Sequence, residues 1–194
     1  MDEHNIQQRE VMDAEILALW PDLPVIHRFL LATGQGLREI VSMDWTHLDP
    51  PTRIWIQPNS NADVSHTITI PKWVMSWLPE RTDNPAVFIG DSGARFSPAT
   101  ASNLLMSHVN AIGIEDITVH DLRAYTLKQL GELGSLGLSV KATAHIVQGQ
   151  QKGGCTGDQA GVKADLLEKW SQRLQEVVLE GGTTIGDTPL SNSH

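Results

Sequence analysis

The sequence lacks the features of a membrane protein, of a disulfide-bonded protein from an oxidising compartment, and of a protein that binds nucleic acid through an overall positive charge. No apolar run reaches the length of about 18 residues that a membrane span needs, and the first residues lack the pattern of a signal peptide. The single cysteine, Cys155, excludes an internal disulfide framework and favours a cytoplasmic location. The 14 Lys and Arg against 23 Asp and Glu give a net charge of −9, which argues against strong nonspecific binding to nucleic acid.

Signatures of metal, phosphate-loop and protease sites are also missing. The eight histidines show no ligand spacing and no paired cysteines exist, so we expect no metal and no cofactor. Gly34 and Gly36 are not followed by the Gly-Lys-Ser/Thr of a phosphate loop. The segment Gly90-Asp-Ser-Gly resembles the nucleophile segment of chymotrypsin-like proteases. That fold is all-β, however, so we interpret the segment as a turn.

The 194 residues, 40% of them hydrophobic, suit one α+β domain that is mainly α-helical. Alternating residues predict strands at 53–57 and 66–70, which form a small antiparallel β-hairpin or three-stranded sheet, and a short strand at 86–90. We expect the domain to span residues 1–180 and the Gly/Thr/Ser-rich tail, 181–194, to be disordered. Helical spacing occurs at 10–20, from Val25, from Leu37 and again at Met43–Trp45, and at 71–78, 97–112, 118–133, 139–147 and 162–179.

Capping residues and glycines mark several helix ends. Ser97 is the expected N-cap of a helix with Pro98 at its first position, and Thr118 is the expected cap of the next helix. Glycines near Gly134 stop that helix. A glycine-rich segment over 149–161 precedes the last, amphipathic helix.

Three stretches, taken in order, resemble one protein family. Residues 32–49 (ATGQGLREIVSMDWTHLD) resemble the first motif of the tyrosine recombinases, the phage integrase family. A hairpin ending in TITIP follows where that family has its own hairpin, and Thr118-Val-His-Asp-Leu-Arg resembles its His-x-x-Arg helix start. The resemblance covers roughly residues 12–179, including an acidic last helix with a tryptophan. It implies an integrase catalytic-domain fold, without the family's arm-binding and core-binding domains, and a link to DNA integration and site-specific DNA recombination.

The resemblance also implies a chemistry against which each residue can be compared. In this family a tyrosine hydroxyl attacks a DNA phosphodiester and forms a covalent phosphotyrosyl bond. Two arginines and a histidine or tryptophan hold the non-bridging oxygens, where charge develops in the transition state. A lysine on the hairpin helps to protonate the leaving oxygen.

His120 and Arg123 match the family positions. Their i, i+3 spacing puts both side chains on one helix face, so one phosphate could meet both. We interpret them as retained phosphate-facing residues. The alternative is that His120 caps or packs and that Arg123 pairs with a carboxylate.

The first arginine does not match. The family pattern, Thr-Gly-x-Arg with a glutamate three positions later, puts Gly36 at the arginine position when Thr33 and Glu39 are aligned. Arg38 follows two residues later, about 200° around a helix, which predicts an exposed side chain on the far face. Irregular backbone near Gly34 and Gly36 would let Arg38 substitute. We therefore count Arg38 with His120 and Arg123 as candidate DNA-binding residues.

The lysine, the later histidine and the nucleophile do not match either. Residues 54–71 contain no lysine, and Asp63 lies there instead. Counting along the third motif puts Gln150 at the histidine position and Gln159 at the tyrosine position. The only tyrosine, Tyr125, lies two residues after Arg123, so we expect it in the core. The nearby Cys155, Thr156 and Asp158 lack an identifiable base, and we interpret them as parts of a glycine-rich loop.

We draw three hypotheses from these comparisons. The first is an integrase-like domain whose catalysis is impaired and whose DNA binding is weak or lost. The second is a protein-interaction module on the same fold without DNA binding, which the charge of −9 favours. The third is an active recombinase whose tyrosine comes from a partner chain. Expected partners are DNA, a second copy of the chain or a full-length integrase, and no membrane.

Overall fold

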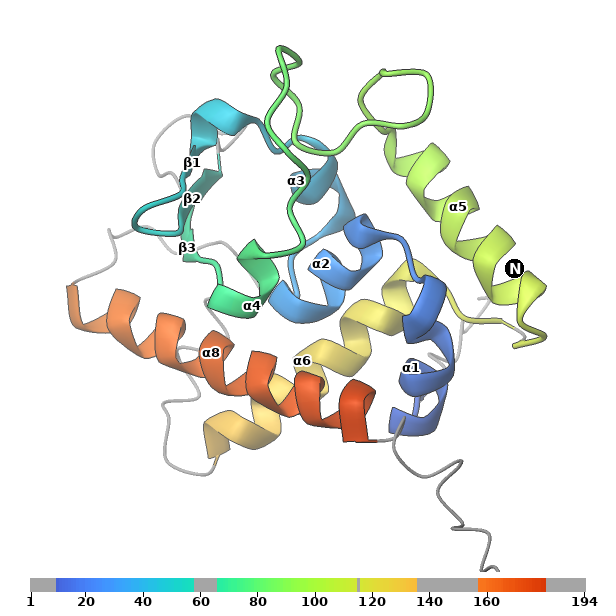
Figure 1. Cartoon of the computed structure of the whole chain (residues 1–194). Coiled ribbons are helices and arrows are strands. Elements are labelled where there is room, and N and C mark those ends of the chain that lie inside the picture. Colours follow the sequence, from blue (N-terminus) through green and yellow to red (C-terminus); the bar gives the residue numbers. More distant parts are fainter. Residues whose placement is uncertain (1–9, 58–65, 115, 136–156, 181–194) are drawn as a thin grey trace, which may run out of the picture.

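The computed structural model of the chain describes residues 10–57, 66–114, 116–135 and 157–180. It has the predicted α+β architecture, in which the helices pack together and a small antiparallel sheet lies at one side (Figure 1). The elements in chain order are α1 (Asp13–Leu19), η1 (Trp20–Asp22), α2 (Val25–Thr33), α3 (Leu37–Val41), η2 (Trp45–His47), β1 (Leu48–Asp49), β2 (Ile54–Gln57), β3 (His66–Thr69), α4 (Lys72–Met75), α5 (Pro98–Ala111), α6 (Val119–Ser135) and α8 (Gly157–Glu180).

Helix α2 forms the centre of the core. Its residues from Phe29 to Thr33 are all buried, so the helix is apolar around most of its circumference and needs neighbours on several sides. Helices α3, α6 and α8 supply those neighbours. The buried indole of Trp170 on α8 donates its Nε1–H to the carbonyl oxygen of Leu31 at 2.8 Å, which satisfies the ring's polar atom within the core.

Helix α8 confirms the predicted amphipathic C-terminal helix. Four side chains of its apolar stripe are at most 1% exposed: Leu166, Leu167, Trp170 and Leu174. They pack the helix against α1, α2, α6 and β3, along one side of the molecule (Figure 1). The helix begins at Gly157, so the end of the predicted glycine-rich segment is helical.

The three strands pair antiparallel in the order β1-β2-β3, as the hairpin pattern predicts. Trp55 lies opposite Ile68, and both side chains are buried, at 1% and 4% exposure. Ile56, one residue on, is 47% exposed. This alternation fixes the register, because a shift by one residue would expose Trp55.

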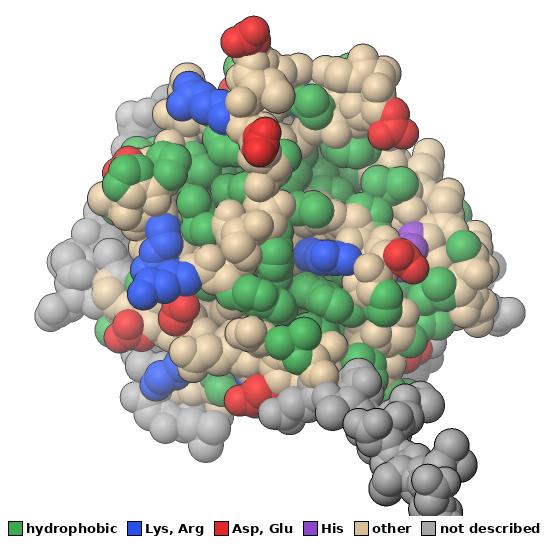
Figure 2. Space-filling model, viewed as in Figure 1, with side chains coloured by type: hydrophobic (Ala, Val, Ile, Leu, Met, Phe, Trp, Pro, Cys, Tyr) green, Lys and Arg blue, Asp and Glu red, His purple; other side chains and the backbone are tan. Residues whose placement is uncertain are grey.

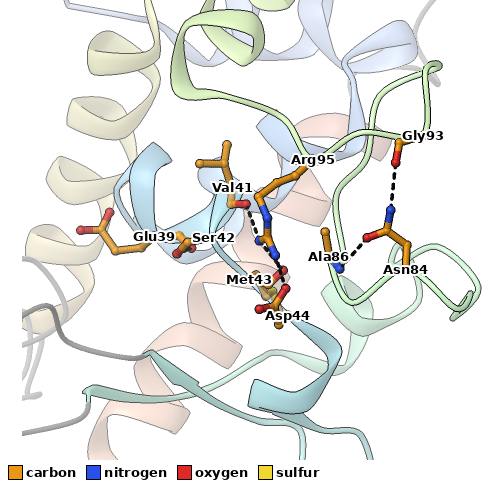
Figure 3. A network of polar contacts seen from close by, with 9 residues as sticks. All are labelled: Glu39, Val41, Ser42, Met43, Asp44, Asn84, Ala86, Gly93 and Arg95. Atoms are coloured by element: carbon orange, nitrogen blue, oxygen red, sulfur yellow. Dashed lines mark hydrogen bonds and ion pairs between the residues drawn. The ribbon is translucent and has the colours of Figure 1, made fainter.

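The predicted strand at 86–90 is wrong. Ala86 and Ile89 form only isolated bridges, to Asp44 and Arg95, so no continuous ladder forms there. Backbone hydrogen bonds hold the segment, from the Val87 N–H to the Met43 carbonyl at 3.0 Å and from the Gly90 N–H to the Ala94 carbonyl at 2.9 Å. Nearby, the guanidinium of Arg95 pairs with Asp44 and donates to the carbonyl oxygen of Val41 at 3.0 Å (Figure 3). The predicted helical turn at Met43–Trp45 is also wrong, because Asp44 is extended and helix η2 starts at Trp45.

The expected turn in Gly90-Asp-Ser-Gly is present, with the Gly93 N–H donating to the Gly90 carbonyl at 2.8 Å. The predicted helix at 139–147 and the tail at 181–194 lie outside the described residues. Among the helices that are described, none is long and apolar enough to cross a membrane. The described part of the chain also contains no group of three His, Cys, Asp or Glu side chains that could hold a metal ion.

Candidate nucleic-acid interface

A cavity of about 410 Å³ lies where α3, α5 and the beginning of α6 meet. Arg38 from α3 lines it together with His120 and Arg123 from α6. These are the three residues that the sequence identifies as candidate DNA-binding residues. The fold brings them together from two helices that are far apart in the chain.

The junction between α2 and α3 shapes one side of this cavity. Helix α2 ends at Thr33, and Gly34 adopts a left-handed conformation with φ +66°. Gln35 is buried; it donates to the Thr33 carbonyl at 3.1 Å and accepts from Gln57 of β2 at 3.2 Å. Gly36 is extended and precedes the first residue of α3. The chain therefore turns sharply here, and the hydrogen bond between Gln35 and Gln57 holds the turn against the sheet.

This turn explains the position of Arg38. The separation of about 200° between positions 36 and 38 holds only if one helix contains both residues. Helix α3 begins at Leu37, with Gly36 outside it, so the helical-wheel placement of Arg38 on the far face is wrong. Arg38 is exposed, and it lines the same cavity as Arg123.

The start of α6 is fixed by a reciprocal cap. The Thr118 N–H donates to the Asp121 carboxylate at 2.9 Å, and the Asp121 N–H donates to the Thr118 hydroxyl at 3.3 Å. This confirms Thr118 as the N-cap. One turn later Leu122 is fully buried, which leaves the opposite face, with His120 and Arg123, toward the cavity.

Arg123 is positioned by the backbone of the α2–α3 junction. Its Nε–H donates to the carbonyl oxygen of Gly34 at 3.1 Å. The helices approach closely at this point, because a Cβ atom on Gly34 would lie 3.3 Å from side-chain atoms of both Thr126 and Leu127. The left-handed glycine therefore allows α6 to bring Arg123 against the junction.

Glu39 is the acidic residue of the cavity. It lies so close to Gly36 that a Cβ atom added there would be 2.0 Å from its Oε2 atom. A side chain at position 36, where the integrase pattern has arginine, would thus have to displace the Glu39 carboxylate. The cavity contains two guanidinium groups that stay charged at all ordinary pH values, against this one carboxylate.

The face of the molecule shown in Figure 2 does not carry an excess of positive charge. On the face shown in Figure 2, Lys and Arg side chains are scattered among Asp and Glu around a hydrophobic centre. Positive charge at the cavity is therefore local, within a chain of net charge −9.

Tyr125 lies in the core, as expected. It is 4% exposed, packs its ring against Trp170 with centroids 5.9 Å apart, and donates its hydroxyl to the Asp13 carboxylate at 2.7 Å. Burial, together with this hydrogen bond to a carboxylate, raises the pKa of the phenol. Both effects make the hydroxyl a poor nucleophile.

The remaining family positions lie partly outside the described residues. Gln150 and Asp63 are outside them, and Gln159 belongs to the first turn of α8. The described strands of the hairpin contain no lysine, and Lys72 follows in α4.

Sequence reasoning missed the second wall of the cavity. Helix α5 contributes Pro98, Ser102 and Met106, which are spaced by four residues and therefore share one face. The side chain of Ile117, before α6, is buried against the same space. The four-residue spacing of these α5 residues, which starts in the capped first turn, could have indicated that they share a face. Only the fold shows that this face lines the same cavity as Arg38.

Comparisons with known proteins identify relatives of this fold. An integrase from mycobacterium phage Brujita has 20% sequence identity and a TM-score of 0.61, over 88% of this chain and 63% of that one. The XerA recombinase has 15% identity and a TM-score of 0.58, over 86% and 64%. The Tn1549 transposon integrase, in complex with circular intermediate DNA, has 15% identity and a TM-score of 0.61, over 84% and 66%.

At these identities the similarity shows a shared fold, and this chain spans less than two thirds of the length of each neighbour. No curated protein matches the sequence. The model of the phage integrase family matches residues 13–141, which include the α2–α3 junction, the hairpin and the His120–Arg123 helix start. Because this match covers more than half of its length, the chain belongs to the phage integrase family.

Proposed function

We propose that this chain binds the phosphates of DNA at the cavity between α3, α5 and α6 and does not cleave the strand. The observation that carries this proposal is the convergence of Arg38, His120 and Arg123 on one cavity. A guanidinium can hold two phosphate oxygens at once, and an imidazole on the same helix face adds a third donor. That one integrase of the same fold was solved with DNA supports the choice of ligand.

Arg38 takes the place of the arginine that the family has at position 36. The sharp turn at Gly34 and Gly36 starts α3 anew, so Arg38 enters the cavity from the second residue of that helix. Arg123 is held by the Gly34 carbonyl of the same turn. One phosphate bound between the two arginines would therefore link α3 and α6.

The absence of cleavage follows from the groups that the chemistry requires. A covalent intermediate needs a nucleophile, and the only tyrosine in the sequence donates its hydroxyl to Asp13 inside the core. The family position for the nucleophile holds Gln159, whose amide cannot form a phosphotyrosine-type bond. Proton transfer to the leaving oxygen needs an acid, and the hairpin sequence from 54 to 71 has no lysine.

The net charge of −9 supports a second candidate, a protein-interaction module that has kept the fold and lost DNA. The two candidates differ in a measurable way. A site that neutralises phosphates releases counterions, so its affinity falls as salt rises. A chain that has lost DNA binding gives no signal even at low salt.

The test is fluorescence anisotropy with a labelled duplex between about 50 and about 200 mM salt. We expect salt-sensitive binding. Arg123→Gln should weaken it and lower the slope of log affinity against log salt by about one. Arg81→Gln, which removes the same charge from an exposed loop outside the cavity, is the matched control and should change little. No binding at low salt would favour the interaction module instead.

Cleavage is tested separately with a nicked suicide substrate, which traps a covalent protein–DNA adduct. We expect none on a denaturing gel. An adduct would refute the catalytic half of the proposal, and its loss in Tyr125→Phe would identify the nucleophile. An adduct that survives Tyr125→Phe would show that another group performs the attack.

A further inference from the structure

The cavity has two walls of different chemistry. The guanidinium groups of Arg38 and Arg123, together with His120, line one part of the cavity, here called the cationic wall, and Met106, Pro98 and Ile117 line another part, here called the apolar wall. Met106 is 56% exposed, although its neighbours on α5, Leu105 and Val109, are almost fully buried. A ligand that fits this cavity therefore has an anionic end and an apolar face.

A duplex phosphate satisfies only the cationic wall. In B-form DNA the bases are stacked, and their faces become accessible only when a nucleotide leaves the stack. We propose that the cavity receives one unstacked nucleotide of DNA, with its phosphate at Arg38 and Arg123 and its base against Met106 and Ile117. This inference rests on the proposed function and names the form of DNA that the same site binds best.

The properties of the apolar wall support this assignment. A volume of about 410 Å³ lies at the lower end of the range of small-molecule sites, which suits a single group rather than a length of helix. Methionine is flexible and adapts to differently shaped partners, so Met106 would accept any of the four bases. Ser102, between Pro98 and Met106 on the same face of α5, places one hydroxyl on this wall. The site should consequently prefer an unstacked nucleotide without strong base preference.

The test compares three DNA molecules by anisotropy at low salt: an intact duplex, the same duplex with one unpaired nucleotide, and that duplex with an abasic residue at the unpaired position. We expect the unpaired nucleotide to raise affinity about fivefold over the intact duplex, as contact with one base surface allows. The abasic molecule should lose this gain, which separates base contact from simple flexibility of the DNA.

Substitutions in the apolar wall test whether it causes the preference for the unpaired nucleotide. Met106→Ser should remove the fivefold preference, measured as the ratio of the affinities for the unpaired and the intact molecules, and Met106→Leu should keep this ratio. Ile112→Ser is the matched control, because Ile112 is also an exposed apolar residue at the end of α5 and does not line the cavity.

The outcomes are separable from those of the proposed function. Equal affinity for the intact and the unpaired molecules, with salt-sensitive binding to both, overturns this inference and leaves phosphate binding standing. A preference that survives Met106→Ser or the abasic substitution overturns it as well. Absence of binding to all three molecules overturns both proposals together.

Discussion

Acidification should destabilise the fold through one buried histidine, His27 of α2. The ring is fully buried, and its Nε2 lies 2.9 Å from the carbonyl oxygen of Ala101 on α5. Since a carbonyl only accepts, Nε2 must carry the proton, and Nδ1 is buried without a hydrogen-bond partner in the described structure. Burial therefore lowers the pKa of His27 from 6.5 to about 4, against a smaller opposing effect of the Ala101 carbonyl.

The sign and size of the effect follow from this pKa. The unfolded chain takes up a proton near pH 6.5, whereas the folded chain resists protonation down to about pH 4. Stability from this group is therefore present above pH 6.5 and is lost as the pH falls through that window. Between pH 7 and pH 5 the loss is about 2 kcal/mol, on the scale of 1.36 kcal/mol for each pKa unit.

The assay is urea unfolding, followed by tryptophan fluorescence, at pH 7 and at pH 5. His27→Gln keeps a donor for the Ala101 carbonyl and removes the titration, so its free energy of unfolding should fall about 2 kcal/mol less between these pH values than that of the unchanged chain. His120→Gln, the same substitution at an exposed position, is the control for the change of residue itself. Equal pH dependence in the His27 variant and the unchanged chain would refute the assignment of this loss to His27.

Three further changes test the cavity and its supports. Glu39→Gln removes the cavity's carboxylate and should tighten binding to duplex DNA about threefold at low salt, measured by anisotropy; weaker binding would mean that Glu39 helps to hold the site open. Gly34→Ala should cost about 1 kcal/mol more in urea unfolding than Gly93→Ala. Both glycines have positive φ, but only the Cβ at position 34 would lie 3.3 Å from α6, and equal costs would argue against that close approach. Tyr125→Phe should lower stability by about 1 kcal/mol, since it removes the hydrogen bond to Asp13, and should leave DNA affinity unchanged; a loss of affinity would place the phenol near the ligand.

Local patterns in the sequence were sufficient for most elements of this fold. Ser97 accepts a hydrogen bond from the Thr100 N–H at 3.0 Å, as an N-cap before Pro98 should, and the alternation at 66–70 became the β3 strand paired with β2. The segment at 86–90 has the same apolar character and did not become a strand. Its backbone forms isolated bridges to Asp44 and to Arg95, and no pattern within the segment indicates the contact with Asp44, which lies far earlier in the chain.

The sequence by itself determined the family and the negative net charge, and it carries the prediction that the nucleophilic tyrosine is missing, because these depend on which residues are present and in what order. The tertiary structure alone decided which of the candidate site residues lie at one cavity. Arg38 reaches the cavity of His120 and Arg123 because a left-handed glycine and an extended one end one helix and start another, which a helical wheel cannot represent. The wall from Met106 to Ile117, and the low pKa of His27, likewise come from burial and from the approach of helices distant in the chain. Such contacts depend on how α5 and α6 pack, and a local sequence pattern does not predict that packing.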